Sequence, residues 1–259
     1  MKTDLQAMPL RRRRVRSRSG MVVALAGVAV LLVLSGCAAW RLGQAKALAQ
    51  RSDPLSQRPA EPAVRMLIVG DSTAVGTGAS SPQTSLAGLI AREYPRLLID
   101  NRGRDGALLA EVATQLAIDE QFDVVLVLAG GNDVIRMRDR DAMRTDIEKI
   151  ANAAAARAPL VVMMPSGNVG NAPFFFPPVS WLMASRSRAL HGYVASSAAR
   201  SGLVYVNLFR ERSSDPFVAD PSLNASDGLH PSDAGYRNWW GELQQQAALA
   251  RLLAPAKPP

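Results

Sequence analysis

The sequence has few of the residues that build disulfides, metal sites and phosphate-binding loops. It contains one cysteine, Cys37, and two histidines among 259 residues. A single cysteine excludes a disulfide within the chain, so packing of the core must hold the fold together. These three residues also fall short of the four ligands typical of structural zinc sites. No stretch has the form of a P-loop or of Gly-x-Gly-x-x-Gly. We therefore expect neither a metal nor a cofactor.

Basic charge is concentrated at the N-terminus rather than spread along the chain. The net charge is +8, with an isoelectric point of about 10.3. Residues 1–36 carry seven basic side chains and one acidic one, a net of +6, which leaves +2 for the remainder. A nucleic-acid-binding protein would need basic residues on its folded part. We therefore do not expect nucleic acid as a partner.

The N-terminal segment has the order of an export signal. Arginines between positions 11 and 18 precede an uncharged run from Met21 to Trp40. That run is long enough to span a bilayer as a helix, with the arginines on the cytoplasmic side. The motif "LSGC" at 34–37 resembles the lipobox of bacterial lipoproteins, in which the cysteine is lipidated and becomes the new N-terminus. We predict lipidation of Cys37, with an uncleaved signal anchor as the alternative.

The chain is predicted to have three parts. Residues 1–37 form the export signal or membrane anchor, and 38–63 form a polar, proline-containing linker with one short helix. Residues 64–259 form one domain, which either anchor would hold outside the cytoplasm at the cell envelope. The sequence leaves the oligomeric state open.

Within the domain, apolar runs alternate with amphipathic segments. The apolar runs predict strands at 64–70, 97–100, 122–129, 159–164 and 203–207. The amphipathic segments predict helices at 83–94, 107–118, 139–157, 180–200 and 232–253. Strands that are apolar throughout and alternate with helices favour a parallel sheet covered on both faces. Right-handed crossovers then predict an α/β fold with three α/β/α layers.

Two polar turns are expected to meet at one edge of this sheet. Gly-Asp-Ser at 70–72 follows the first strand, and Gly-Gly-Asn-Asp at 130–133 follows the third. Ligands in such sheets bind beyond the carboxyl ends of the strands. We therefore expect a functional site where these turns meet, with Asp71 and Asp133 in structural roles.

A third polar segment supplies a base. Asp227 precedes His230 by three residues, so carboxylate and imidazole can face each other across one turn. His191 lies in a helix-like stretch and is expected to pack or to face solvent. A serine hydroxyl needs a neighbouring base to act as a nucleophile, and a carboxylate can orient that base. Ser72, His230 and Asp227 supply these groups.

An oxyanion in the same site would need hydrogen-bond donors. The backbone N–H of Ser72, the N–H of a glycine and the Asn132 amide are the candidates.

These segments together resemble the SGNH (GDSL) hydrolase family. Its blocks are Gly-Asp-Ser at 70–72, a glycine after the second strand, Gly-x-Asn-Asp at 130–133 and Asp-x-x-His at 227–230. Gly103 and Gly106 both fit the second block, and the position of Gly106 at the start of the next helix favours it. Thr73 stands where the family's short name has leucine.

The resemblance implies a flavodoxin-like sandwich around a mainly parallel five-stranded sheet. It also implies an ester hydrolase with a Ser72–His230–Asp227 triad and an oxyanion hole of Ser72, Gly106 and Asn132.

The substrate is less defined than the chemistry. Acyl esters, either lipid-type or small, are the first expectation, and O-acetyl groups on envelope carbohydrate are the alternative. A non-catalytic, tethered module that binds acylated glycans is a hypothesis of another class. The three phenylalanines at 174–176 could line an acyl pocket, touch lipid or pack onto the domain.

Overall fold

The structure is a computed structural model that describes residues 18–247. The chain divides into two compact units, residues 1–40 and 41–259. In the first unit, helix α1 (Arg18–Ala49) begins and carries the exposed Cys37. Within residues 18–247, no helix combines the length and apolarity needed to cross a bilayer. The predicted arginine cluster before Arg18 lies outside the described residues.

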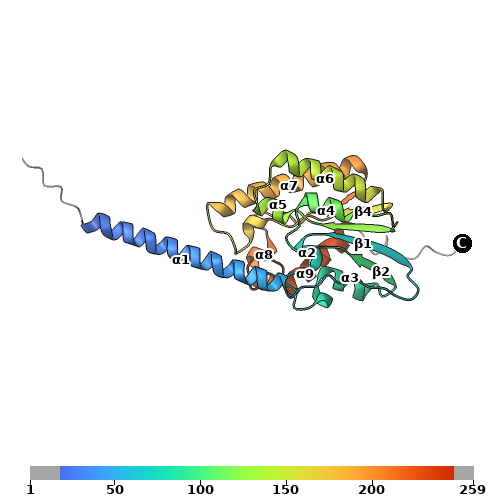
Figure 1. Cartoon of the computed structure of the whole chain (residues 1–259), viewed down its shortest axis with the longest axis horizontal. Helices are drawn as coiled ribbons and strands as arrows, with labels where there is room; N and C mark the ends of the chain where they lie inside the picture. The colour runs from blue at the N-terminus through green and yellow to red at the C-terminus, as the bar shows by residue number, and fades with distance from the viewer. Residues whose placement is uncertain (1–17, 248–259) are drawn as a thin grey trace, which may run out of the picture. The chain divides into compact units, whose positions relative to one another are not determined.

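The second unit is built around a parallel five-stranded sheet (Figure 1). Its strands are β1 (Val64–Gly70), β2 (Leu97–Asn101), β3 (Val124–Leu128), β4 (Leu160–Met163) and β5 (Val204–Tyr205). They lie in the order β2-β1-β3-β4-β5, and every neighbouring pair is parallel. This order is the flavodoxin-like one, so the predicted fold class is confirmed.

Helices cover both faces of the sheet, as Figure 1 shows. One face packs against α3 (Leu86–Glu93) and α9 (Asp233–Ala247). The other packs against α4 (Leu109–Gln115), α6 (Arg140–Ala155) and α7 (Val179–Ser201). All five helices were predicted near these positions. The part of the last predicted helix beyond Ala247 lies outside the described residues.

Strand β1 shows why these strands are apolar throughout. Side chains alternate between the two faces of a strand. Met66 and Ile68 therefore enter the core beside α3 and α9, while Leu67 and Val69 enter the core beside α4, α6 and α7. All four side chains are fully buried.

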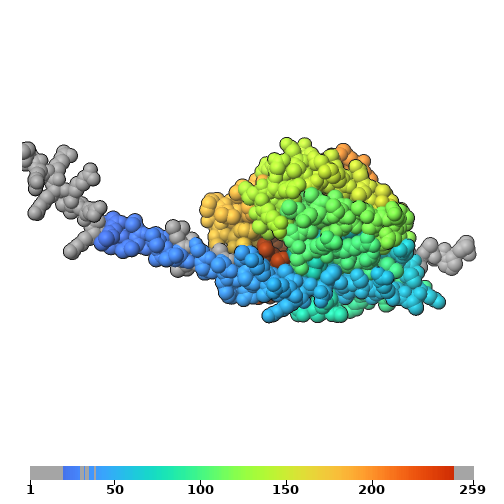
Figure 2. All heavy atoms as spheres, in the orientation of Figure 1, coloured from blue at the N-terminus to red at the C-terminus, as the bar shows by residue number. Residues whose placement is uncertain are grey.

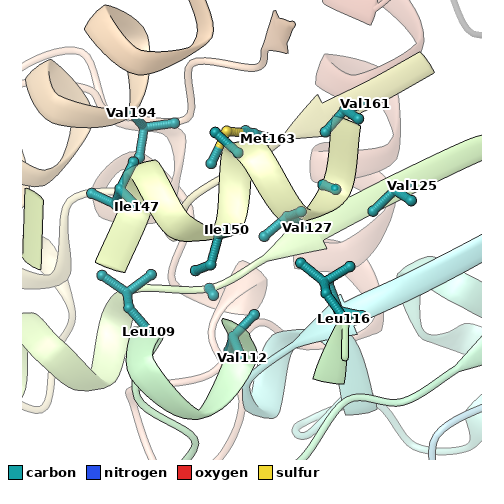
Figure 3. Packing of buried hydrophobic residues seen from close by; sticks show 14 of the residues in the cluster. Leu109, Val112, Leu116, Val125, Val127, Ile147, Ile150, Val161, Met163 and Val194 are labelled. Atoms are coloured by element: carbon teal, nitrogen blue, oxygen red, sulfur yellow. The ribbon is translucent and has the colours of Figure 1, made fainter. Parts of the chain in front are cut away.

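Helix α6 shows how a helix covers the sheet. The Asp139 side chain caps its first turn by accepting from the N–H groups of Asp141 and Ala142, at 3.0 and 2.9 Å. Its apolar side chains recur at helical spacing and face the sheet. Figure 3 shows Ile147 beside Val194 of α7, and Ile150 belongs to the same buried cluster as Val127 of β3. The core on this face thus joins three elements.

Several short helical turns between these elements were not predicted, because single turns carry no periodic pattern. They are α2 (Ser72–Val75), η1 (Pro82–Thr84), α5 (Gly131–Ile135), η2 (Val169–Asn171), α8 (Pro216–Ala219) and η3 (Pro221–Leu223). Two of them, α2 and α5, begin inside the polar turns at the sheet edge.

The segment predicted as a linker is more ordered than expected. Helix α1 continues through its first part to Ala49. Further on, Gln57 and Ile99 exchange two backbone hydrogen bonds of 2.9 Å, so the chain pairs with the outer edge of β2. Leu55 packs against the core beside α3 and α9. The exposed edge of β2 accounts for this order, because its backbone groups need partners.

Candidate active site

The turn after β1 places Ser72 at the carboxyl edge of the sheet. Gly70 has φ +156°, and a side chain there would overlap the backbone oxygen of Leu128. Only glycine therefore lets β1 pass β3 this closely. The Asp71 carboxylate then caps α2, accepting from the Thr73 N–H at 3.0 Å and the Thr73 hydroxyl at 2.8 Å. Ser72 is consequently the first residue of a helical turn.

Asp71 also joins this turn to the one that follows β3. Its second oxygen accepts a hydrogen bond from the Gly130 N–H at 3.2 Å. Burial raises the pKa of the Asp71 carboxyl, and the hydrogen bonds from Thr73 and Gly130 oppose that rise. The predicted structural role of Asp71 is confirmed by these contacts.

Ser72, His230 and Asp227 form one chain of hydrogen bonds. The Ser72 hydroxyl oxygen lies 2.9 Å from His230 Nε2, and His230 Nδ1 lies 2.6 Å from Asp227 Oδ2. A carboxylate only accepts, so Nδ1 carries the proton and Nε2 of the neutral ring is free to accept from the serine. The structure thus brings together three residues from two distant segments of the chain.

Asp227 is buried and held from several sides. Its Oδ1 accepts from the backbone N–H groups of Leu229 and His230, at 2.9 and 3.1 Å. Burial raises the pKa of this carboxyl, but the hydrogen bond and charge of His230 and the two backbone donors outweigh it. The net pKa lies below its ordinary value, so Asp227 is ionised at neutral pH.

The three predicted oxyanion donors line one cavity with the serine. The Ser72 N–H has no partner within α2 because it is the first helical residue. No acceptor for it, or for the Gly106 N–H, exists among residues 18–247. Asn132 Nδ2 donates to the Ala107 carbonyl at 3.2 Å, and an amide nitrogen has a second hydrogen to offer.

Gly103, the other candidate for the second block, is occupied elsewhere. Its N–H donates to Asn101 Oδ1 at 3.0 Å, and a Cβ there would lie 2.7 Å from that of Ala74. Gly103 thus serves packing beneath the Ser72 turn. Gly106 borders the cavity, and Gly103 does not.

The cavity has a volume of about 420 Å³. Figure 2 shows the hollow in the surface, with the red C-terminal region at its base. Apolar side chains from several elements face it, among them Val169, Phe174, Leu229 and Trp239. The site therefore combines a polar hydrogen-bonded chain with a largely apolar pocket.

The family follows from comparison with known proteins. Residues 68–237 match the GDSL-like Lipase/Acylhydrolase family. The chain belongs to this family. It is accordingly a hydrolase that acts on ester bonds. No relative was found among curated protein sequences.

Solved structures similar to this GDSL hydrolase share its fold. The α/β hydrolase LAE5 from the metagenome of Lake Arreo, Spain, is 17% identical with a TM-score of 0.57, over 73% of this chain and 96% of LAE5. A lipase/acylhydrolase from Enterococcus faecalis is 18% identical, with a TM-score of 0.55 over 75% and 100% of the two chains. The acetylxylan esterase Axe2 from Geobacillus stearothermophilus is 19% identical, with a TM-score of 0.52 over 72% and 94%.

Thr73, where the GDSL name has leucine, contributes to the capping of α2. Its hydroxyl and its N–H both donate to the same oxygen of Asp71. The departure from leucine therefore adds a hydrogen bond to the serine turn.

Asp133 has the structural position that was predicted. It is fully buried, and its Oδ2 accepts from the Leu109 N–H at 2.9 Å, which joins α5 to the start of α4. Its Oδ1 has no hydrogen-bond partner among the described residues. Burial raises the pKa of this carboxyl to about 6.

The second histidine packs inside the domain. His191 Nε2 lies 2.8 Å from the Ser166 carbonyl oxygen, and Nδ1 lies 2.6 Å from the Tyr205 hydroxyl. The carbonyl can only accept, so Nε2 carries the proton and Nδ1 accepts from the tyrosine. Burial lowers the pKa of His191 to about 4. The ring is therefore neutral at physiological pH.

The three adjacent phenylalanines have different surroundings. Phe174 lines the cavity, and Phe175 packs against the core beside α4, α6 and α7. Phe176 is 52% exposed, and the Arg41 guanidinium lies 5.1 Å from its ring centre. The run is thus divided between the cavity, the core and the surface.

The cavity also has a wall that sequence analysis missed. Leu42, Ala45, Lys46 and Ala49 of α1 line it. Their spacing of three, four and seven residues marks one face of a helix, which is a signal visible in the sequence. It was overlooked because the segment was interpreted as a linker.

Proposed function

We propose that this chain is a serine ester hydrolase in which Ser72 is the nucleophile, His230 the general base and Asp227 the residue that orients it. The observation that supports this assignment is the continuous hydrogen-bonded chain from Asp227 through His230 to Ser72, which ends in a cavity. The distances of 2.6 and 2.9 Å suit proton transfer between the three groups.

In the first half of the reaction, Ser72 Oγ attacks the ester carbonyl carbon while His230 Nε2 takes the hydroxyl proton. Asp227 keeps the proton of His230 on Nδ1 and stabilises the positive ring that forms. The tetrahedral intermediate collapses, the alcohol departs with the proton from Nε2, and an acyl-serine remains.

In the second half, water gives a proton to His230 Nε2 and attacks the acyl-serine. Collapse of the second intermediate releases the acid and returns the proton to Ser72 Oγ. In both halves the negative oxygen would be stabilised by the N–H groups of Ser72 and Gly106 and by the Asn132 amide.

We propose acyl esters as the substrates, because the cavity beside Ser72 is largely apolar. O-acetyl groups on envelope carbohydrate are the second candidate, and the similar structure Axe2 is an acetylxylan esterase. A binding module without turnover is disfavoured by the complete hydrogen-bonded chain.

A labelling experiment tests the catalytic assignment. We expect a fluorophosphonate probe to modify Ser72 and to leave Ser72→Ala unlabelled, while the unaltered protein hydrolyses p-nitrophenyl acetate. Ser85, a buried serine that caps α3, offers a matched control. Ser85→Ala should still be labelled. Label on a serine other than Ser72 would overturn the assignment.

We further propose that the enzyme is tethered at the cell envelope through Cys37. The "LSGC" motif and the exposure of Cys37 on α1 support a lipid attachment. Cleavage before Cys37 would remove residues 1–36 and leave an acylated cysteine at the N-terminus. Intact mass of the membrane-extracted protein tests this. Cys37→Ser should abolish both acylation and cleavage, whereas an unacylated, full-length wild-type protein would support the signal anchor instead.

A further inference from the structure

One helical face before the GDSL domain borders the cavity that holds Ser72. The residues of α1 on this face are Leu42, Ala45, Lys46 and Ala49. The family match begins only at residue 68. The residues of this wall therefore lie outside the part of the chain that matches the family.

Contacts at both ends hold this part of α1 in place. The Arg41 guanidinium donates to the Pro173 carbonyl oxygen and lies over the Phe176 ring, and Phe174 between these two residues lines the cavity. After the helix, the chain pairs with β2 through Gln57. The helical face is thus connected to the domain by polar contacts, an aromatic contact and a backbone pairing.

Three of the four residues on this face are apolar, and the fourth is Lys46. Ala45 and Ala49 leave space next to the cavity, and Leu42 is 50% exposed although it borders the site. An apolar group in the cavity would cover Leu42 and gain the free energy of removing that surface from water. Lys46 has no ion-pair partner among the described residues, and its long side chain can keep the ammonium in water above such a group.

We propose that this face of α1 is a wall of the substrate pocket and makes the enzyme prefer esters with long apolar acyl chains over acetyl esters. The proposal rests on the ester hydrolysis proposed above and specifies its substrate class. A cavity of about 420 Å³ lies in the size range of pockets for drug-sized ligands, well beyond what an acetyl group fills.

The test is a chain-length series of p-nitrophenyl esters from acetate to decanoate, with full-length protein in detergent. The wild type should have a higher kcat/KM for decanoate than for acetate. Ala45→Phe would fill part of the cavity next to α1, and we expect it to lower the decanoate-to-acetate ratio of kcat/KM at least about tenfold.

Gly43→Phe is the matched control on the same helix, because a Cβ at Gly43 would meet no heavy atom within 4 Å and Gly43 does not line the cavity. Its ratio should equal that of the wild type. Arg41→Ala removes the contacts of α1 with Pro173 and Phe176 and does not fill the pocket. It should raise KM for decanoate more than KM for acetate.

The outcomes separate the two proposals. A wild type that hydrolyses no ester of the series would contradict the proposed function. A wild type that hydrolyses them, with the same chain-length profile in Ala45→Phe, Gly43→Phe and Arg41→Ala, would overturn only the assignment of the α1 wall.

Discussion

The two histidines of this chain lie in environments that give them opposite properties. His230 sits at the carboxyl edge of the sheet, between a buried carboxylate and a serine hydroxyl, and it borders the cavity. His191 sits on α7 between a carbonyl oxygen and a phenol, both uncharged, and is buried. Asp227 can balance a positive charge on His230, whereas burial keeps His191 neutral. Partners and access, rather than residue type, decide which imidazole can transfer a proton.

The strongest test of this comparison replaces each histidine in turn. His230→Ala should lower kcat for p-nitrophenyl acetate by about a millionfold, because it removes the base from the proposed triad. His191→Ala should keep kcat within about threefold per folded molecule, because this substitution lowers the stability of the fold and removes no group of the proposed triad. Kinetics with folded protein quantified by circular dichroism distinguish the two. Loss of activity in His191→Ala with activity kept in His230→Ala would contradict the assignment.

The carboxylate beside His230 provides the next largest effect. Asp227→Asn should lower kcat by about ten-thousandfold, because a neutral amide neither fixes the tautomer nor stabilises the positive ring. Asp141→Asn, on the exposed first turn of α6, is the control and should leave kcat unchanged. Steady-state kinetics at neutral pH, where Asp227 is ionised, provide the measurement. A small effect would show that His230 acts without its carboxylate.

A smaller effect is expected from the amide that shares the cavity with His230. Asn132→Ala should reduce kcat by about a hundredfold to a thousandfold, because it removes one of the three proposed donors to the oxyanion. Asn152→Ala, exposed on α6, should have no effect. The measurement is steady-state kinetics in which kcat and KM are determined separately. An increase in KM alone would mean that Asn132 binds the substrate without stabilising the transition state.

The smallest effect concerns His191 and stability. Its pKa is about 4 in the folded protein, against about 6.5 for a free imidazole. The unfolded state therefore binds more protons between these values, and the folded state loses stability as pH falls from about 6.5 to about 4. The loss amounts to about 3 kcal/mol at the acid end.

His191→Gln keeps a hydrogen-bonding side chain but does not titrate, so it isolates this contribution. Asp133 has a raised pKa of about 6, so its contribution to the free energy of unfolding increases as pH falls. Both proteins contain Asp133, so this contribution cancels in the difference between them. Urea unfolding at several pH values should show the stability advantage of the wild type shrinking as pH falls. A difference that is constant with pH would contradict a neutral, buried His191.

The comparison of the histidines also shows how far sequence reasoning reached. Asp227 lies three residues before His230, so their contact was predictable from spacing alone. Ser72 is 158 residues away from His230, and the prediction of their contact needed the parallel sheet and the family resemblance. The partners of His191 were not predicted, because Ser166 and Tyr205 lie in other elements and carry no motif.

By itself the sequence determined the order of strands and helices and the residues that meet at the sheet edge. Strands that are apolar on both faces need cover on both faces, and the carboxyl ends of the strands in a parallel sheet all lie at the same edge. Only the tertiary structure showed that Gly106 borders the cavity while Gly103 does not, divided the phenylalanines at 174–176 and brought one face of α1 to the cavity. These outcomes depend on contacts between segments far apart in the chain, and local sequence periodicity can mark the face of a helix without identifying what that face contacts.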